Sequence, residues 1–175
     1  AKYPSVDFSK IYPGLNSKEI DQLQRECFGV RYVFAPFVQF EPVPVTNRFV
    51  QISRAGFRRG AEAQPWPPRK EDFVVFVFGG STTFSYGLPN EGTLVALLQR
   101  ELHQLWPEKR VQCYNFGRGF FFSTQERALF EQLLESGHIP NLAIFIDGVN
   151  DFFYANGKPR LTYELSRYVN GELAT

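Results

Sequence analysis

Ser81 is a candidate nucleophile because of the residues that precede it. The apolar run FVVFVF at 73–78 ends at Gly79 and Gly80, and Ser81 follows, then two threonines. Two glycines allow the chain a sharp exit from a buried strand, which would expose the serine hydroxyl and its backbone amide. Ser81 could equally be a turn or helix-capping residue after a strand. Its chemistry therefore depends on which other segments lie beside it.

Two further segments of small and polar residues follow apolar runs. NFGRGF (115–120) overlaps the end of the apolar run VQCYNF (111–116), and DGVND (147–151) follows the apolar run LAIFI (142–146). Asn150 in the second segment offers an amide N–H donor. Acyl transfer builds negative charge on a carbonyl oxygen, and one positioned donor is typically worth about 10²- to 10³-fold in rate. Asn150 could also simply stabilise a turn.

The elements between these segments predict that they meet. Leucines recur at helical spacing over 91–105, and a second amphipathic helix is predicted from Ser123, with Glu126 completing a capping box, to Gly137. Together with strands at 73–78, 111–116 and 142–146, the order is β-α-β-α-β, which predicts a parallel sheet. Because the carboxyl ends of parallel strands share one edge, we expect the three polar segments to converge there.

These segments resemble the signature blocks of the SGNH (GDSL-like) hydrolases. FGGSTTFSYG is similar to the first block, NFGRGFFFSTQE to the glycine block and DGVND to the Gly-x-Asn block, in the same order over about 70–155. The resemblance implies a flavodoxin-like three-layer α/β sandwich with a parallel sheet. It also implies that Ser81 is the nucleophile and that its amide, the Gly119 amide and the Asn150 side chain bind the oxyanion. One departure concerns the glycine block, where the residue five positions after Asn115 is Phe120 rather than glycine.

A serine hydrolase needs a general base, usually a histidine, and neither histidine of this sequence is expected beside Ser81. His103 is predicted to face solvent from its helix, and His138 precedes the third strand, roughly 15–20 Å from Ser81 at ~3.3 Å per strand residue. The family takes its base from an Asp-x-x-His block that nothing here matches. We therefore expect the sequence to be truncated before that block, and the 175 residues to be inactive as given.

The third strand raises a related expectation. LAIFI is too apolar to remain an uncovered sheet edge. We expect either the rest of the chain or a protein partner to cover it.

Residues 1–70 have a different texture from residues 71–175, which form the hydrolase-like domain. The first segment holds eight of the twelve prolines, and it reads as an irregular, aromatic- and proline-rich N-terminal extension. One helix is predicted, capped by Asn16 and Glu19, with Ile20, Leu23 and Cys27 on one face. Short extended pieces follow over 30–50, and WPP at 66–68 is interpreted as a stiff linker.

Composition excludes several function classes. The formal charge is +1 with no dense basic stripe, which argues against nucleic acid. The cluster Arg54–Arg59 is interpreted as a solvated turn, and Arg118 as a surface side chain that could alternatively meet an anionic substrate group. A P-loop fails because FGGSTTFSYG lacks lysine, and no GxGxxG follows the first strand. No cofactor is expected.

Other polar residues are assigned structural roles. Asp147 and Asp151 are interpreted as loop structure rather than as a metal pair, since a third ligand is missing. Cys27 and Cys113 are interpreted as two buried thiols, with pairing in an oxidising compartment as the alternative. The 19 phenylalanines predict a core or contact surface built from rings.

The sequence thus predicts an esterase acting on O-acyl groups, with acetyl esters of carbohydrates as one substrate class. An acyltransferase is a weaker hypothesis. A different hypothesis is a catalytically inactive SGNH-like scaffold or binding subunit in a larger assembly. No apolar run approaches the roughly 20 residues of a membrane helix. The extension is similar to that of exported or membrane-tethered bacterial members, which suggests a periplasmic location and a membrane tether upstream of Ala1.

Overall fold

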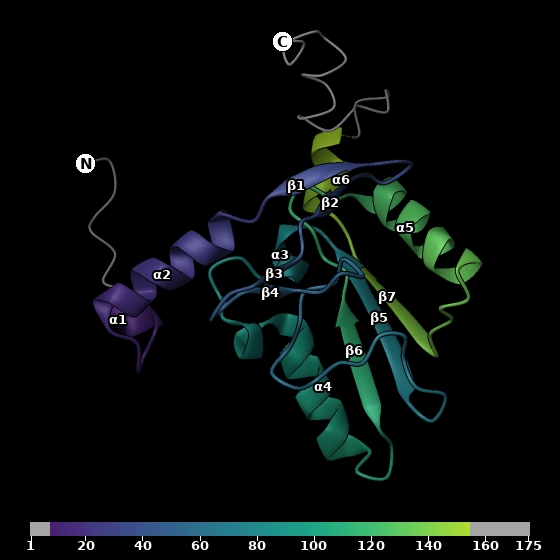
Figure 1. Ribbon diagram of the computed structural model, residues 1–175, viewed down its shortest axis with the longest axis horizontal. Helices are drawn as coiled ribbons and strands as arrows, with labels where there is room; N and C mark the ends of the chain where they lie inside the picture. Colours follow the sequence, from purple (N-terminus) through teal and green to yellow (C-terminus); the bar gives the residue numbers. More distant parts are fainter. Residues whose placement is uncertain (1–7, 155–175) are drawn as a thin grey trace, which may run out of the picture.

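A computed structural model describes residues 8–154 of the chain. It is a mixed α/β protein in which helices flank a three-stranded parallel sheet (Figure 1). The strands are β5 (Phe73–Gly79), β6 (Val111–Asn115) and β7 (Leu142–Ile146), in the order β6-β5-β7. Both pairings are parallel. The parallel sheet predicted from the sequence is therefore confirmed.

The helices after each strand lie close to their predicted positions. β5 leads into the short helix α3 (Ser81–Phe84), the 3₁₀ turn η1 (Asn90–Gly92) and α4 (Leu94–Leu105). β6 is followed by α5 (Ser123–Glu135), and β7 by α6 (Val149–Tyr154). α4 and α5 lie on opposite sides of the sheet (Figure 1). Within the described part of the chain, no helix is both long and apolar enough to span a membrane.

β5 is buried on both faces, as its continuous apolar sequence predicts. Val74, Phe76 and Phe78 pack toward α5, whereas Val75 and Val77 pack toward α4. This alternation follows from the two-residue period of a strand. The strand is therefore a rigid support for the residues that follow Gly79.

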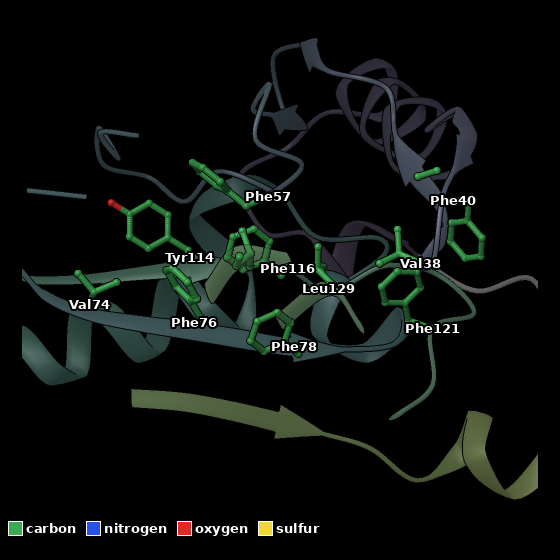
Figure 2. Packing of buried hydrophobic residues seen from close by; sticks show 12 residues of the cluster. Val38, Phe40, Phe57, Val74, Phe76, Phe78, Tyr114, Phe116, Phe121 and Leu129 are labelled. Atoms are coloured by element: carbon green, nitrogen blue, oxygen red, sulfur yellow. The ribbon is translucent and has the colours of Figure 1, made fainter. Parts of the chain in front are cut away.

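Aromatic rings form most of the core on the α5 side of the sheet (Figure 2). Phe57, from the N-terminal region, packs edge-on against Tyr114 and Phe116 of the β6 region. Trp66 contacts Phe57 and Phe76. The interpretation of WPP as a linker is therefore wrong at Trp66, because the ring is a part of the core.

The region before β5 is built from short elements. It contains α1 (Phe8–Ile11), α2 (Ser17–Phe28), the hairpin β1 (Tyr32–Ala35) and β2 (Gln39–Pro42), and the pair β3 (Val45–Thr46) and β4 (Gln51–Ile52). The capping box of Asn16 and Glu19 is confirmed, as is the buried face of α2. Leu23 and Cys27 on that face pack in one cluster with Phe84 of α3. The N-terminal region thus supports the helix that begins at Ser81.

β7 is an edge strand of the sheet, as expected. Among residues 8–154 it pairs with β5 alone, and Leu142 and Phe145 are 43% and 39% exposed. Any cover from the rest of the chain lies outside the described residues. That the edge is covered stays a prediction.

The two cysteines do not pair. Cys27 and Cys113 are both free and buried, and they belong to different clusters. The expectation of two buried thiols is confirmed.

Candidate active site

The segments after the three strands meet beside Ser81, although Ser81 begins the helix α3 and Asn150 lies in the helix α6. Asn150 Nδ2 donates a hydrogen bond to the carbonyl oxygen of Phe121 at 2.5 Å. A Cβ added to Gly80 would lie 2.5 Å from that same nitrogen and 3.2 Å from the Phe121 oxygen. Only glycine therefore allows the Asn150 amide to approach the backbone directly before Ser81. The predicted convergence of these segments is observed.

Ser81 itself is the first residue of α3 and is exposed. Its carbonyl oxygen accepts a hydrogen bond from the N–H of Ser85, which is in the left-handed conformation at the end of the helix. The helix is thus one tight turn. It presents the Ser81 side chain at the carboxyl edge of the sheet.

Asn115, at the end of β6, fastens the second loop to α3. Its Nδ2 donates to the Thr83 carbonyl at 2.9 Å, and its Oδ1 accepts from the Gly117 N–H at 2.9 Å. A Cβ on Gly117 would lie only 2.5 Å from the Phe84 nitrogen. Sequence reasoning used Asn115 only to mark the start of a block, although a buried asparagine at a strand end is a signal for such a role.

Gly119 lies in this loop, but its N–H is already used. It donates to the Tyr32 hydroxyl at 3.3 Å, and that hydroxyl also contacts the hydroxyl of Tyr86 at 3.0 Å. The next residue, Phe120, has a φ of 66° and its side chain is 66% exposed. Among the described residues its N–H makes no hydrogen bond. A bulky residue in the left-handed region is uncommon and is more frequent at functional sites.

Asp151, in α6, holds the segment after β7 against the start of α5. Its carboxylate accepts hydrogen bonds from the Ser123 N–H at 3.2 Å and from the Ser123 hydroxyl at 2.5 Å. The predicted capping box of Ser123 and Glu126 is therefore wrong: Ser123 is the first helical residue, and Asp151 of α6 caps the helix. Asp151 therefore has a structural role, as expected, but it lies in a helix and not in a loop. Within the described part of the chain, no cluster could hold a metal ion.

Arg58 is buried against α3, so the interpretation of residues 54–59 as a solvated turn is wrong at this residue. Its side chain is 1% exposed. Nη1 donates to the carbonyls of Phe84 and Ser85 at 2.6 and 3.0 Å, and Nη2 to that of Leu88 at 2.5 Å. Its backbone N–H also donates to the Asn115 carbonyl at 2.9 Å. Arg58 therefore ties the end of β6 to the turn that carries Ser81.

Arg118 is also buried, at 2% exposure, and is not a surface residue. Its Nη1 donates to the Phe40 carbonyl at 2.6 Å, and its guanidinium lies over the Phe121 ring. Burial lowers the pKa of Arg118 to about 10. The side chain joins the β1–β2 hairpin to the loop after β6.

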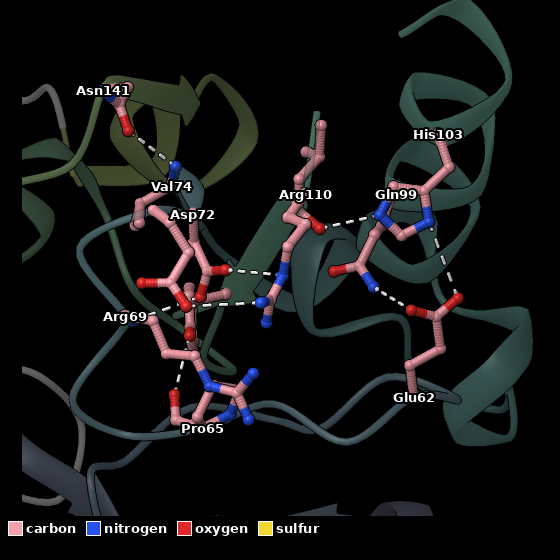
Figure 3. A network of polar contacts seen from close by, with 12 residues as sticks. Glu62, Pro65, Arg69, Asp72, Val74, Gln99, His103, Arg110 and Asn141 are labelled. Carbon is pink, nitrogen blue, oxygen red and sulfur yellow. Dashed lines mark hydrogen bonds and ion pairs between the residues drawn. The ribbon is translucent and has the colours of Figure 1, made fainter. Parts of the chain in front are cut away.

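Neither histidine serves Ser81. His103 bonds the Val111 carbonyl at 2.8 Å and lies 3.7 Å from the Glu62 carboxylate (Figure 3). It is therefore half-buried, and not solvated as the sequence suggested. His138 packs on the Trp66 ring, with centroids 4.5 Å apart. Neither histidine contacts Ser81 in the part of the chain that the structure describes.

Comparison with known proteins adds no identification. No family model and no curated protein sequence matches the chain.

Glu126 is a buried carboxyl group that sequence reasoning assigned only to a helix cap. Burial, together with the neighbouring carboxylates of Asp147 and Asp151, raises the pKa of Glu126 to about 9. Its protonated form can donate to Asp147. The group is therefore neutral at pH 7 and adds no charge at this edge of the sheet.

The raised pKa predicts a pH-dependent stability. In the unfolded chain Glu126 ionises near its ordinary value of 4.5, whereas in the folded protein it ionises near 9. Between these values unfolding releases a proton. The free energy of unfolding therefore falls as pH rises, by at most about 1.4 kcal/mol per pH unit from this group.

Glu126→Gln should remove this dependence, because the amide is neutral at every pH and can still donate to Asp147. Urea unfolding at pH 5 and pH 8 should show the variant gaining stability over the parent at the higher pH. Glu135→Gln, an exposed position on the same helix, is the control and should show no such gain. An equal difference at both pH values would contradict the raised pKa.

Proposed function

We propose that this protein is a serine esterase of the SGNH type that acts on O-acyl esters. The observation that carries the proposal is the position of the Asn150 amide nitrogen, directly beside the backbone of Gly80 and hence beside the exposed Ser81. A hydroxyl and an N–H donor around one small space are what acyl transfer requires.

The sheet topology gives independent support. In sequence order the described strands are arranged 2-1-3, which is the beginning of the flavodoxin-like order. In such sheets ligands bind where the order reverses, outside the carboxyl ends of the first and third strands. Ser81 follows the first of these strands and Asn150 the third. The proposed site therefore lies where this fold class places its ligands.

The proposed reaction has two steps. Ser81 Oγ attacks the ester carbonyl, a base takes its proton, and the Oγ–carbon bond forms while the alcohol leaves with a proton. Water then cleaves the acyl-serine by the reverse sequence, releasing the acid. We propose that the base belongs to an Asp/His pair outside these 175 residues, since both histidines of the sequence lie elsewhere in the fold. An acyltransferase would differ only in using an alcohol acceptor in place of water.

The oxyanion is held by N–H donors on the same edge. We propose the Ser81 amide and the Asn150 side chain, with a third donor from the loop after β6. Gly119, the residue expected from the sequence, would have to release the Tyr32 hydroxyl first. Phe120 has an unused N–H among the described residues and is the better candidate. An acyl ester of a carbohydrate outside the cytoplasm remains our proposal for the natural substrate and location.

A fluorophosphonate probe tests the function, since it reacts with an activated serine hydroxyl. The full-length protein should be labelled at Ser81, as located by peptide mass spectrometry. Thr82→Ala, an exposed neighbour, should still be labelled, whereas Ser81→Ala should not.

The alternative is an inactive SGNH-like scaffold, which the absence of a histidine contact to Ser81 within residues 8–154 favours. Folded full-length protein that stays unlabelled would support this alternative. That result would contradict the esterase proposal.

A further inference from the structure

A groove of about 560 Å³ opens beside Ser81, between α3 and α4. This volume falls within the range typical of small-molecule sites, about 300–1,000 Å³. Two exposed hydroxyl residues, Ser81 and Thr82, lie at one part of the lining. The remaining lining residues are Ser85, Tyr86, Leu88, Gly92, Leu94 and Leu97.

The polar groups of this lining are mostly engaged elsewhere. The Ser85 hydroxyl donates to the Thr82 or Thr83 carbonyl and accepts from the Leu94 N–H at 3.1 Å. The Tyr86 hydroxyl pairs with Tyr32.

The backbone of this turn is occupied in the same way. Arg58 takes up the Ser85 and Leu88 carbonyls. What the groove offers a ligand away from Ser81 and Thr82 is therefore the surface of three leucines and the Tyr86 ring.

The leucines also need an explanation as surface residues. Leu88, Leu94 and Leu97 are each more than a third exposed. Grouped apolar exposure around a concave surface marks a binding site more often than it marks chance. The ring of Phe28 stacks on Tyr86 at 5.4 Å and extends the apolar surface.

We propose that this groove, the leucine groove, receives the acyl chain of the ester. The inference rests on the proposed function and narrows its substrate class from acyl esters in general to esters of medium-chain fatty acids. The ester carbonyl lies at Ser81, and the chain runs over Tyr86 toward Leu88, Leu94 and Leu97. A bare acetyl group would leave these residues uncovered.

Chain-length dependence of ester hydrolysis by the full-length protein tests the proposal. A buried methylene is worth up to about 0.8 kcal/mol, or about fourfold, and about twofold in an open groove. From p-nitrophenyl butyrate to octanoate, four methylenes should therefore raise kcat/KM at least ~15-fold. Leu97→Trp, which fills the groove, should abolish this gain, so that the ratio of kcat/KM for octanoate to that for butyrate falls to about one.

Leu105→Trp is the matched control, because Leu105 lies on the same helix outside the groove and is 71% exposed. It should keep the octanoate preference. Equal kcat/KM for acetate and octanoate, each lost in Ser81→Ala, would overturn the leucine groove while leaving the esterase standing.

A ligand-binding experiment tests the leucine groove separately from the esterase activity. Dansyl-undecanoic acid should bind Ser81→Ala with a rise in fluorescence that octanoate reverses, and Leu97→Trp should weaken that binding at least ~10-fold. If this holds while no ester is cleaved and no probe labels Ser81, the groove is supported and the esterase fails. Dansyl-undecanoic acid binding that Leu97→Trp leaves unchanged would overturn the groove.

Discussion

Replacing Asn150 with alanine is expected to lower kcat/KM for ester hydrolysis about 10²- to 10³-fold, the usual cost of one oxyanion donor. The reason is that Asn150 Nδ2 has two hydrogens, and only one is used by the Phe121 carbonyl. The other is available to an oxygen bound between this amide and Ser81. Because the oxyanion forms after binding, the loss should fall on kcat more than on KM.

Two comparisons test whether the loss is electrostatic. Asn150→Asp keeps the shape of the side chain but places a negative charge where the oxyanion forms, so its activity should be at or below that of the alanine variant. Unfolding curves should show both variants folded under assay conditions. An alanine variant that retains activity within about threefold of the parent would remove Asn150 from the proposed mechanism.

Arg58→Ala is expected to reduce the free energy of unfolding by about 3–5 kcal/mol, because it removes a buried charged donor from three carbonyls at once. Those carbonyls belong to Phe84, Ser85 and Leu88, in the turn that carries Ser81. The guanidinium also lies 4.7 Å from the centre of the Phe84 ring, so its loss leaves a cavity there. Chemical denaturation measures the change.

Two control variants separate the effect of losing a positive charge from the effect of losing the three buried hydrogen bonds. Arg54→Ala, four residues earlier and exposed, should change stability by less than about 0.5 kcal/mol. Arg58→Lys keeps the charge but cannot reach all three carbonyls, so it should be intermediate. If Arg58→Ala has the same free energy of unfolding as the parent, the Arg58 hydrogen bonds do not hold α3 in place.

Arg58 also bears on the proposed chemistry. Under conditions in which it is folded, the Arg58→Ala variant should react with a fluorophosphonate more slowly than the parent, because the position of Ser81 is less fixed. Labelling at the parental rate by the folded variant would show that Arg58 supports the fold without positioning Ser81.

Local sequence was sufficient for the three strands of the parallel sheet, for α2, α4 and α5, and for the order of these elements. The continuous apolar run at 73–78, the leucine spacing of α4 and the capping box at Asn16 each depend on residues near one another in the chain. Their physical basis is burial on two strand faces, helical periodicity and satisfaction of the first N–H groups of a helix. All three predictions agree with the structure.

Predictions failed where a distant segment supplied the partner. The Ser123 cap failed because Asp151, 28 residues later, takes that role. Arg58 and Arg118 looked like solvent-facing cations, since sequence gives no sign of the carbonyls that bind them. Trp66 read as part of a linker for the same reason, because its ring partners come from other strands and loops.

The sequence by itself determined that strands and helices alternate, that the sheet is parallel and that three segments of small and polar residues follow the strands at one edge. Only the tertiary structure decided that the Asn150 amide lies against Gly80, that Tyr32 occupies the Gly119 N–H, and that leucines of α4 line a groove beside Ser81. The physical reason is the distance along the chain over which each interaction acts. Periodicity and capping act within a few residues, whereas a site depends on contacts between segments whose relative positions are fixed by packing of the whole core.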